Sequence, residues 1–323
     1  WKWENYWLVY CLFGYIAVPF LVCLLFSPGF MSALGQVPAK TLWWIFLLGA
    51  IYGLANLTFG LSLRYLGIAL GYALSLGLMM AIGTLVPPAI DGRLTKLFEG
   101  AGGTLLISGI VIALIGIGIS GFAGLLKSRE TEKVSGSDAP GQVANNEFDI
   151  KKGLAAALFV GVTGSAAALG IEQGAPIADA CIANGTNPLF GTCAVFLVLY
   201  TGSFAVTLVW CLYMAGRNGG VRLFWTSDGS ATARFPFRNY LLCALAGFLW
   251  YINYVFFGMG KAQMGEYSFV AWGILMTLTI VFATLWGLYR KEWKNVSRKT
   301  YALMWIGLVI LLAASFLIGM SSA

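Results

Sequence analysis

The stretch that decides the fold is GLANLTFGLSLRYLGIALGYALSLGL, Gly53 to Leu78, in which Arg64 is the one charged residue. It belongs to an apolar run from Leu42 to Ile90, which is more than twice as long as the roughly 20 residues that a helix needs to cross a membrane. Two spans with a tight reversal are therefore predicted. Residues 62–67 bring a charge and a glycine together, so Arg64 is expected in the reversal, at a membrane surface.

The composition of the chain excludes an ordinary soluble domain. Of its 323 residues 59% are hydrophobic, 15% aromatic and only 10% charged, whereas a soluble domain carries about 25% charged residues. Nine apolar runs occur, and their length of about 20 residues favours helices over the short alternating strands of a β-barrel. The runs are residues 6–26, 42–61, 66–90, 104–126, 153–171, 189–215, 240–260, 267–289 and 301–320. The predicted class is an all-α polytopic membrane protein with nine transmembrane helices.

The distribution of basic residues supports this number of spans. When the connections are assigned alternately to two sides, all but four of the 20 Lys and Arg fall on one side. The four on the other side are Lys40, Arg93, Lys96 and Lys261. Positive connections face the cytoplasm, which predicts a cytoplasmic residue 1 and a C-terminus outside. The net charge of +7 follows from this rule, and no nucleic-acid partner is expected.

One long polar stretch divides the chain, KSRETEKVSGSDAPGQVANNEFDIKK at residues 127–152. Its Gly, Ser and Pro content is typical of a flexible linker, predicted to be cytoplasmic. Residues 1–126 then form a first half-bundle of four helices, and residues 153–323 form a second half-bundle of five. The chain begins with Trp1 rather than Met, so we expect one further helix in front of it, which would give five plus five.

An internal repeat accompanies this division. The segments ANLTFGLSLRYLG and INYVFFGMGKAQMG match at one constant offset, with a Gly after each basic residue. The matched pairs are Asn56 with Asn253, Phe59 with Phe256, and Arg64 with Lys261. The charge count predicts that the first copy runs inward and the second outward. Inverted repeats of this kind are typical of secondary transporters, whose substrate site lies near the midplane between the halves.

Six stretches of the sequence carry a resemblance to a known family. They are WKWENYW (residues 1–7), NLTFGLSLRYLG (56–67), FDIKKGL (148–154), NPLF (187–190), LWYINYVFFGMG (249–260) and KEW (291–293). In this order, and over essentially the whole chain, the sequence resembles the L-rhamnose/proton symporter family of the drug/metabolite transporter superfamily. The resemblance implies a ten-helix (5+5) inverted-repeat fold, of which this chain would lack the first helix.

The resemblance also implies a function. It predicts a secondary active transporter, multi-pass in the bacterial inner (plasma) membrane, that imports a deoxysugar such as L-rhamnose together with a proton. The expected partners are a small-molecule sugar, the proton and the lipid bilayer. A shared fold does not by itself fix the substrate.

A neutral sugar needs hydrogen-bonding partners for its hydroxyls and an aromatic surface for its C–H face. On residues 240–260, Trp250, Asn253 and Tyr254 are spaced i, i+3, i+4 and are predicted to share one helical face. Tyr52 and Asn56, spaced i, i+4, come from the repeat-related helix. The candidate substrate-binding residues are Tyr52, Asn56, Trp250, Asn253, Tyr254, Ser268 and Trp272. Equally, the two asparagines are explained by hydrogen bonds that only hold helices together.

Proton coupling needs a group that titrates, and the chain contains no histidine. The carboxylates near membrane depth are Glu172, Asp179 and Glu266, all on the predicted outer side. Glu172 and Glu266 are the proton-coupling candidates, because partial burial would favour the proton-carrying form of Glu172. The alternatives are a loop carboxylate for Glu172 and a surface ion pair with Lys261 for Glu266.

The sequence departs from the family it resembles on the helix after the second repeat copy. The family pattern there is Tyr-Asp-x-x-Ser-Trp-x-x-His-Met. The chain keeps Tyr267, Trp272 and Met276, but has Ser268 and Leu275 at the positions of the acid and the histidine. The alternative function is therefore a same-fold transporter, including an exporter, for a different sugar or small metabolite and without proton coupling.

No Walker loop, metal-ligand cluster or catalytic triad occurs in the sequence. Neither an enzyme nor an ATP-driven pump is predicted, and no cofactor or metal is expected. The six cysteines are mostly expected to be small buried residues. Cys181 and Cys193 flank a predicted outer connection, where a disulfide could form.

Overall fold

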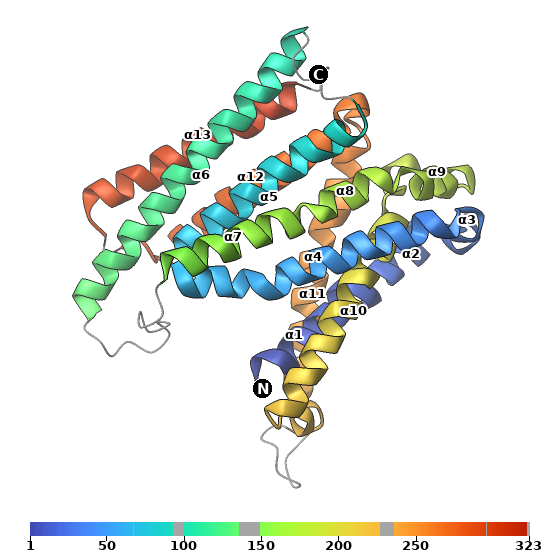
Figure 1. Ribbon diagram of the computed structural model, residues 1–323, viewed down its shortest axis with the longest axis horizontal. Coiled ribbons are helices and arrows are strands. Elements are labelled where there is room, and N and C mark those ends of the chain that lie inside the picture. Colours follow the sequence, from blue (N-terminus) through green and yellow to red (C-terminus); the bar gives the residue numbers. More distant parts are fainter. Residues whose placement is uncertain (67, 93–99, 136–148, 227–235, 295, 322–323) are drawn as a thin grey trace. The chain divides into compact units, whose positions relative to one another are not determined.

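The computed structural model describes residues 1–66, 68–92, 100–135, 149–226, 236–294 and 296–321, and Figure 1 shows the labelled helices. The elements in chain order are α1 (Trp3–Cys11), η1 (Leu12–Ala17), α2 (Val18–Phe26), α3 (Phe30–Gln36), α4 (Ala39–Leu66), α5 (Ile68–Ile90), α6 (Gly100–Ser135), α7 (Ile150–Gly164), α8 (Ala166–Gln173), α9 (Ala175–Ala183), η5 (Pro188–Phe190), α10 (Cys193–Arg217), η6 (Val221–Phe224), α11 (Phe237–Lys261), η7 (Gly265–Val270), α12 (Ala271–Tyr289) and α13 (Arg298–Met320). The described ranges contain no strand. Apolar runs form helices because a helix satisfies its backbone polar groups within the segment.

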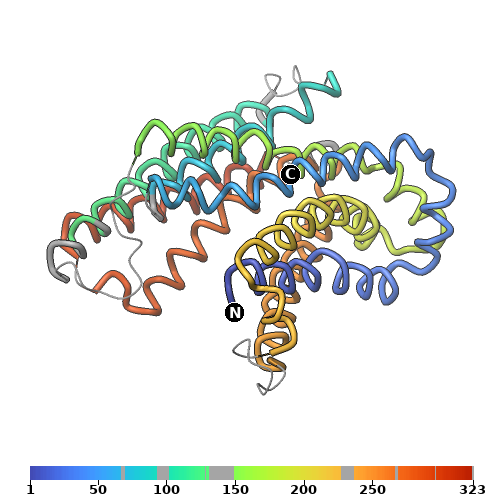
Figure 2. The backbone as a smooth tube through the Cα atoms, turned by 60° about the horizontal axis from the view of Figure 1, so that its bottom comes forward, coloured from blue at the N-terminus to red at the C-terminus, as the bar shows by residue number. Residues whose placement is uncertain are grey.

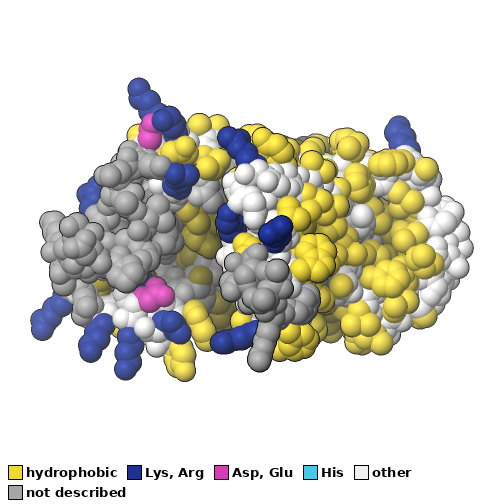
Figure 3. All heavy atoms as spheres, turned by 90° about the horizontal axis from the view of Figure 1, so that it is seen from below, with side chains coloured by type: hydrophobic (Ala, Val, Ile, Leu, Met, Phe, Trp, Pro, Cys, Tyr) yellow, Lys and Arg dark blue, Asp and Glu magenta, His cyan; other side chains and the backbone are white. Residues whose placement is uncertain are grey.

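Nine helical segments in the described ranges are long and apolar enough to cross a membrane. They coincide with the nine predicted runs to within a few residues, except that the fifth extends to Ala183 through α7, α8 and α9. The protein is an all-α polytopic membrane protein. On the face drawn in Figure 3, hydrophobic side chains cover wide areas, and most of the visible charged side chains are Lys and Arg. The inverted ten-helix arrangement stays a prediction.

The chain forms two compact units, each built from two segments. Unit 1 contains Trp1–Leu54 and Leu169–Gln263, and unit 2 contains Ala55–Ala168 and Met264–Ala323. Each unit therefore combines residues from both sides of the predicted linker. The predicted half-bundles, residues 1–126 and 153–323, follow the internal repeat and are not these compact units. That division stays a prediction. Part of the linker, residues 136–148, lies outside the described residues, whereas residues 127–135 continue α6.

In unit 1, α1, η1 and α2 pack against α10 and α11. α4 approaches α10 closely, because a Cβ added at Gly49 or Gly202 would overlap the backbone of the other helix. Ser203 on α10 donates a hydrogen bond from its Oγ to the carbonyl oxygen of Gly49 at 2.7 Å. The Gly49–Gly53 spacing is typical of closely packed membrane helices.

In unit 2, α6 runs along α13, which Figures 1 and 2 both show. α5 packs against α6, α7 and α12. Glycines again permit close approach: Gly116 of α6 faces Ile310 and Leu311, and Gly307 of α13 faces Ser120. Small residues therefore allow the helices of this unit to pack closely.

Connections that the charge count placed on one side lie together within unit 2. Lys127 Nζ lies 2.9 Å from Glu292 Oε2, which joins the end of α6 to the connection between α12 and α13. The amide of Asp149 donates to the carbonyl oxygen of Tyr65 at 3.2 Å.

The reversal after the second span begins about one turn later than predicted. Arg64 is exposed in the last turn of α4, which ends at Leu66. A cation there interacts favourably with the helix dipole.

Candidate functional site

A close contact between two glycines brings η1 onto α11 in unit 1. A Cβ added at Gly14 would meet the Cα of Gly247 at 3.4 Å, and one at Gly247 would meet the amide nitrogen of Gly14 at 2.7 Å. Trp250 and Tyr254 follow Gly247 by one and two turns. The contact therefore places them beside the residues of η1.

The η1 segment is a π-helical turn, and Pro19 accounts for it. Proline has no N–H and cannot donate to the carbonyl four residues before it, which is that of Tyr15. The amide of Val18 instead reaches Phe13, five residues back. Single π-turns of this kind occur frequently at functional sites. Here the turn carries Tyr15, which is 2% exposed.

An aromatic cluster fills the interior of unit 1. Around Trp250 the ring centroids lie at 4.9 Å to Tyr15, 5.1 Å to Tyr200 and 4.7 Å to Tyr254. Tyr15 and Tyr200 stack at 5.5 Å. The hydroxyls of Tyr52 and Tyr254 lie 3.4 Å apart. We call these five residues the aromatic cluster; α4, η1, α10 and α11 each contribute to it.

The aromatic cluster combines apolar ring faces with phenolic hydroxyls. Its four tyrosines are buried, whereas Trp250 is only partly buried and gives the cluster an accessible edge. Next to it the hydroxyl of Tyr251 is buried and has no hydrogen-bond partner among the described residues. Rings with polar handles are the combination that recognises amphipathic ligands.

Of the predicted substrate-binding residues, Tyr52, Trp250 and Tyr254 come together in the aromatic cluster. Asn253 is exposed and does not join it. The helical wheel explains this: Trp250 and Tyr254 point in nearly the same direction, and Tyr251 rather than Asn253 continues their buried face.

The other three candidates, Asn56, Ser268 and Trp272, belong to unit 2. Trp272 is 2% exposed and donates from its indole nitrogen to the carbonyl oxygen of Met79 at 3.2 Å. Its ring packs against Gly83, where a Cβ would lie 2.5 Å from the indole nitrogen. Asn56 and Ser268 are partly buried. Whether all seven candidates serve one site stays a prediction.

A buried ion pair lies at the C-terminal end of α11. Lys261 Nζ contacts Glu172 Oε1 of α8, and the two side chains are 10% and 9% exposed. Next to Glu172, the side chain of Gln173 accepts a hydrogen bond from the indole of Trp44. Lys261 therefore pairs with Glu172; the side chain of Glu266, the partner suggested by the sequence, lies outside the described residues.

Sequence reasoning missed Tyr15, Tyr200 and Glu4. The two tyrosines lie in the middle of apolar runs, and a hydroxyl at that depth is the signal that could have found them. Glu4 is 4% exposed, although it stands at the start of a run, where a charge ordinarily faces the membrane surface.

The described residues contain no group of His, Cys, Asp or Glu side chains that could hold a metal ion. All six cysteines are buried and free, so Cys181 and Cys193 do not form the disulfide that was considered.

The nine spans and the polar interior of unit 1 define a class: a polytopic helical membrane protein with buried polar and ionisable groups, as membrane transporters have. The sequence profile of the L-rhamnose-proton symport protein (RhaT) family matches residues 1–323. The chain belongs to this family.

Curated relatives agree with the family match. The L-rhamnose-proton symporters of Salmonella paratyphi B, Salmonella newport and Salmonella typhimurium are each 30% identical to the chain over 324 aligned positions. The alignments cover 100% of this chain and 91% of each relative. No solved structure matches the chain.

Proposed function

We propose that the protein is a secondary active transporter that imports L-rhamnose together with a proton. Membership of the family over the whole chain supports this function, as do the names of the relatives, L-rhamnose-proton symporters. Family membership favours this function over the alternative of a same-fold transporter without proton coupling. We expect no enzymatic activity.

The observation that carries the proposal is the aromatic cluster around Trp250. A deoxysugar has an apolar C–H face and a methyl group that favour aromatic rings, and hydroxyls that need hydrogen-bonding partners. Trp250 offers the partly accessible ring, and Tyr52 and Tyr254 offer hydroxyls next to it. These three residues are the proposed sugar contacts of unit 1. Asn56, Asn253, Ser268 and Trp272 are further proposed substrate-binding residues.

For proton coupling we propose Glu172, with Glu266 as the second candidate. The Glu172–Lys261 pair is largely removed from water, where an ion pair is stable only while both partners are charged. Protonation of Glu172 removes one charge and releases Lys261. One proton thereby changes the contact between α8 and the end of α11, which also carries Trp250 and Tyr254.

The proposed location is the bacterial inner membrane, with the C-terminus outside. The distribution of Lys and Arg supports this orientation. Within unit 1, Lys2 Nζ donates to the carbonyl oxygen of Asn218, so two connections assigned to the cytoplasm lie at one end. The test is labelling of a cysteine introduced at either terminus with a membrane-impermeant thiol reagent on whole cells, in a background in which the native cysteines give no signal.

The experiment that tests the function is uptake of labelled L-rhamnose into proteoliposomes under an imposed pH gradient. The expected result is accumulation that stops when a protonophore collapses the gradient. A panel of other sugars establishes specificity, since Ser268 and Leu275 differ from the family pattern. Absence of accumulation of any deoxysugar, with or without the gradient, would refute the proposal.

A further inference from the structure

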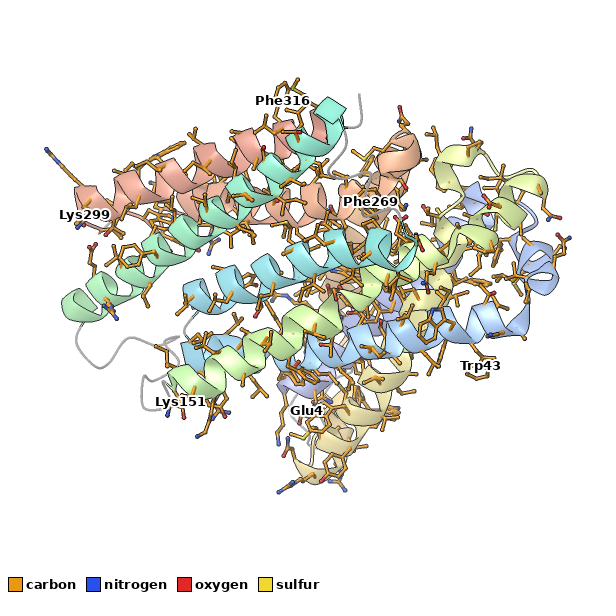
Figure 4. All side chains as sticks on the ribbon, turned by 45° about the horizontal axis from the view of Figure 1, so that its top comes forward. Glu4, Trp43, Lys151, Phe269, Lys299 and Phe316 are labelled. Atoms are coloured by element: carbon orange, nitrogen blue, oxygen red, sulfur yellow. The ribbon has the colours of Figure 1, made fainter. Side chains whose placement is uncertain are left out.

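A second buried carboxylate lies in unit 1, at the end opposite the Glu172–Lys261 pair. Glu4 stands in the first turn of α1, which packs against α10, α11 and η6; Figure 4 labels it. Cys243, near the start of α11, contacts the carbonyl oxygen of Tyr6 on α1. Lys261 follows Cys243 by about 27 Å of helix, and Trp250 and Tyr254 lie between them.

The contacts of Glu4 are with neutral groups. The residue is 4% exposed, and its Oε1 accepts a hydrogen bond from Asn218 Nδ2 at 3.0 Å. Among the described residues Glu4 makes no ion pair. A buried carboxylate in a membrane protein that makes no ion pair calls for a functional explanation.

The adjacent Asn5 supplies the second observation. Asn5 is fully buried, and its Nδ2 donates to the carbonyl oxygen of Gly220 at 2.9 Å. This bond fixes the orientation of the amide, because the reverse orientation would set two oxygens against each other. Asn5 Oδ1 is then a buried acceptor with no hydrogen-bond partner among the described residues.

Asn5 Oδ1 and Glu4 Oε1 both lie close to the position that a Cβ of Gly220 would occupy. A Cβ added at Gly220 would lie 3.1 Å from Asn5 Oδ1 and 3.4 Å from Glu4 Oε1. Glu4 Oε1 already accepts from Asn218, but Asn5 Oδ1 is an unsatisfied buried acceptor, which is destabilising unless a donor reaches it. A proton on Glu4 supplies the donor: the new O–H of the carboxylic acid can point to Asn5 Oδ1.

The charged and titratable groups around Glu4 do not replace this proton. Lys2, the N-cap residue of α1, is engaged by the carbonyl oxygen of Asn218. The basic residues at this end of the packed elements, Arg217 on α10, Arg222 on η6 and Arg238 on α11, are exposed, as is Tyr213 on α10. Cys211 on α10 and Tyr240 and Cys243 on α11 pack with an apolar cluster. The residues between 226 and 236 lie outside the described ranges.

We propose that Glu4 is a proton-binding residue of the symport cycle. It takes up and releases the transported proton at this end of unit 1, and in its protonated form it donates a hydrogen bond to Asn5 Oδ1. The proton comes from a hydronium ion of the aqueous phase at this end, whose O–H bond breaks as the O–H bond of the carboxylic acid forms, and it returns to water on release. This inference rests on the proposed function. Protonation of Glu172 breaks its ion pair with Lys261, whereas protonation of Glu4 adds a hydrogen bond to a neutral amide.

The transport test compares Glu4→Gln with Asp179→Asn in proteoliposomes. Asp179 is an exposed carboxylate of the same unit with no proposed role in transport. Two rates are measured for L-rhamnose: accumulation driven by a pH gradient, and counterflow without one. For Glu4→Gln the ratio of the first rate to the second falls by about 100-fold, and its dependence on pH is lost. Asp179→Asn behaves as the wild type.

An infrared measurement decides the question even if Glu4→Gln transports nothing. On acidification, the wild type and Asp179→Asn gain the C=O stretching bands of two buried carboxylic acids, Glu4 and Glu172, whereas Glu4→Gln gains only the band that disappears in Glu172→Gln. Unchanged bands in Glu4→Gln, or an unchanged ratio of the two transport rates, overturn the inference. Failure of the proposed function is distinguishable, because the wild type itself would then show no gradient-driven accumulation.

Discussion

In unit 1 the buried side chains include Tyr15, Tyr52, Tyr200, Tyr251 and Tyr254 and the charged residues Glu4 and Lys261; all six cysteines belong to it too. Among the described residues of unit 2, the buried side chains are aliphatic, small or hydroxyl-bearing, and Phe269 and Trp272 are the large aromatic ones. Buried ionisable groups in a membrane protein mark functional sites, because they are costly to keep there. The comparison supports the proposal that the transport chemistry lies mainly in unit 1.

The ion pairs of the two units give the largest expected difference. In unit 1, Glu172→Gln leaves Lys261 charged, buried and unpaired, which should destabilise the protein by about 3–5 kcal/mol. In unit 2, Glu292→Gln removes a pair whose carboxylate is 53% exposed, at an expected cost of about 0–1 kcal/mol. Unfolding of both variants in detergent micelles measures the difference.

The double variant Glu172→Gln/Lys261→Gln is the control for this prediction. It leaves no buried charge unpaired, so it should recover part of the stability that the single variant loses. If Glu172→Gln and Glu292→Gln are equally stable, the pair of unit 1 is not buried in the membrane-embedded protein, and the contrast between the units weakens.

Tryptophans of the two units should differ in transport. Trp250 contacts three rings of the aromatic cluster, whereas Trp286 on α12 is 64% exposed. We expect Trp250→Ala to lower the ratio of maximal rate to KM for L-rhamnose by about 100-fold, which corresponds to about 2.7 kcal/mol. Trp286→Ala should transport at the wild-type rate, since its ring faces lipid.

Initial uptake rates over a range of L-rhamnose concentrations test this prediction. Trp250→Phe is a useful intermediate, because it keeps an aromatic face but loses ring area, and its rate should lie between the other two. A normal KM and normal rate for Trp250→Ala would move the sugar site away from the aromatic cluster.

Much of the fold could be predicted from the sequence because membrane crossing depends on local properties. A run such as residues 240–260 needs only its length and apolarity to be identified as a span. Likewise the spacing of Gly49 and Gly53 indicates a close helix contact, although the partner helix, α10, follows only from the structure. The lipid-facing aromatic residues also follow from position: Trp43 and Phe316 are 64% and 69% exposed and point away from the helices in Figure 4.

The candidate site was only partly predictable, because it depends on contacts between distant segments. Tyr15 reaches Trp250 through the π-turn before Pro19 and the contact of Gly14 with Gly247, neither of which a helical repeat encodes. Glu172 was identified as a candidate, but its partner Lys261 follows it by most of three helices. Glu4 has the sequence context of a surface residue, and it is buried only because α1 packs against α10, α11 and η6.

The glycine contacts of the two units provide a smaller contrast. A Cβ at Gly202 of unit 1 would overlap the backbone of Phe46, and helix backbones cannot yield without separating. A Cβ at Gly116 of unit 2 would meet Ile310 Cγ2 at 2.9 Å, and a side chain can rotate away. We therefore expect Gly202→Ala to cost about 1–3 kcal/mol, and Gly116→Ala clearly less.

Thermal unfolding of these two variants in the same detergent measures the contrast. Gly35, which has open space around its Cβ position, gives the matched control, since Gly35→Ala should be neutral or slightly stabilising. Equal losses in Gly202→Ala and Gly116→Ala would mean that the α6–α13 seam is as rigid as the α4–α10 seam.

The smallest expected effect concerns a charge at the surface of unit 2. Asp149 caps α7, accepting hydrogen bonds from the amides of Lys151 and Lys152 at 3.1 Å each, and its other oxygen lies 3.2 Å from Lys152 Nζ. These contacts, the backbone bond from Lys152 first, lower the pKa of the carboxyl group below its usual value. A lowered folded-state pKa stabilises the protein above the pKa of the unfolded chain, and this stabilisation is lost as the pH falls through the folded-state value.

Asp149→Asn keeps a capping oxygen but not the charge, so it should be slightly less stable than the wild type at neutral pH and equally stable in acid. Unfolding curves across the acidic range measure this convergence, and Asp149→Ala, which lacks the cap as well, should stay less stable throughout. Parallel curves for the wild type and Asp149→Asn would show that the charge contributes nothing in the membrane-embedded protein, leaving the charge-dependent stability with the buried groups of unit 1.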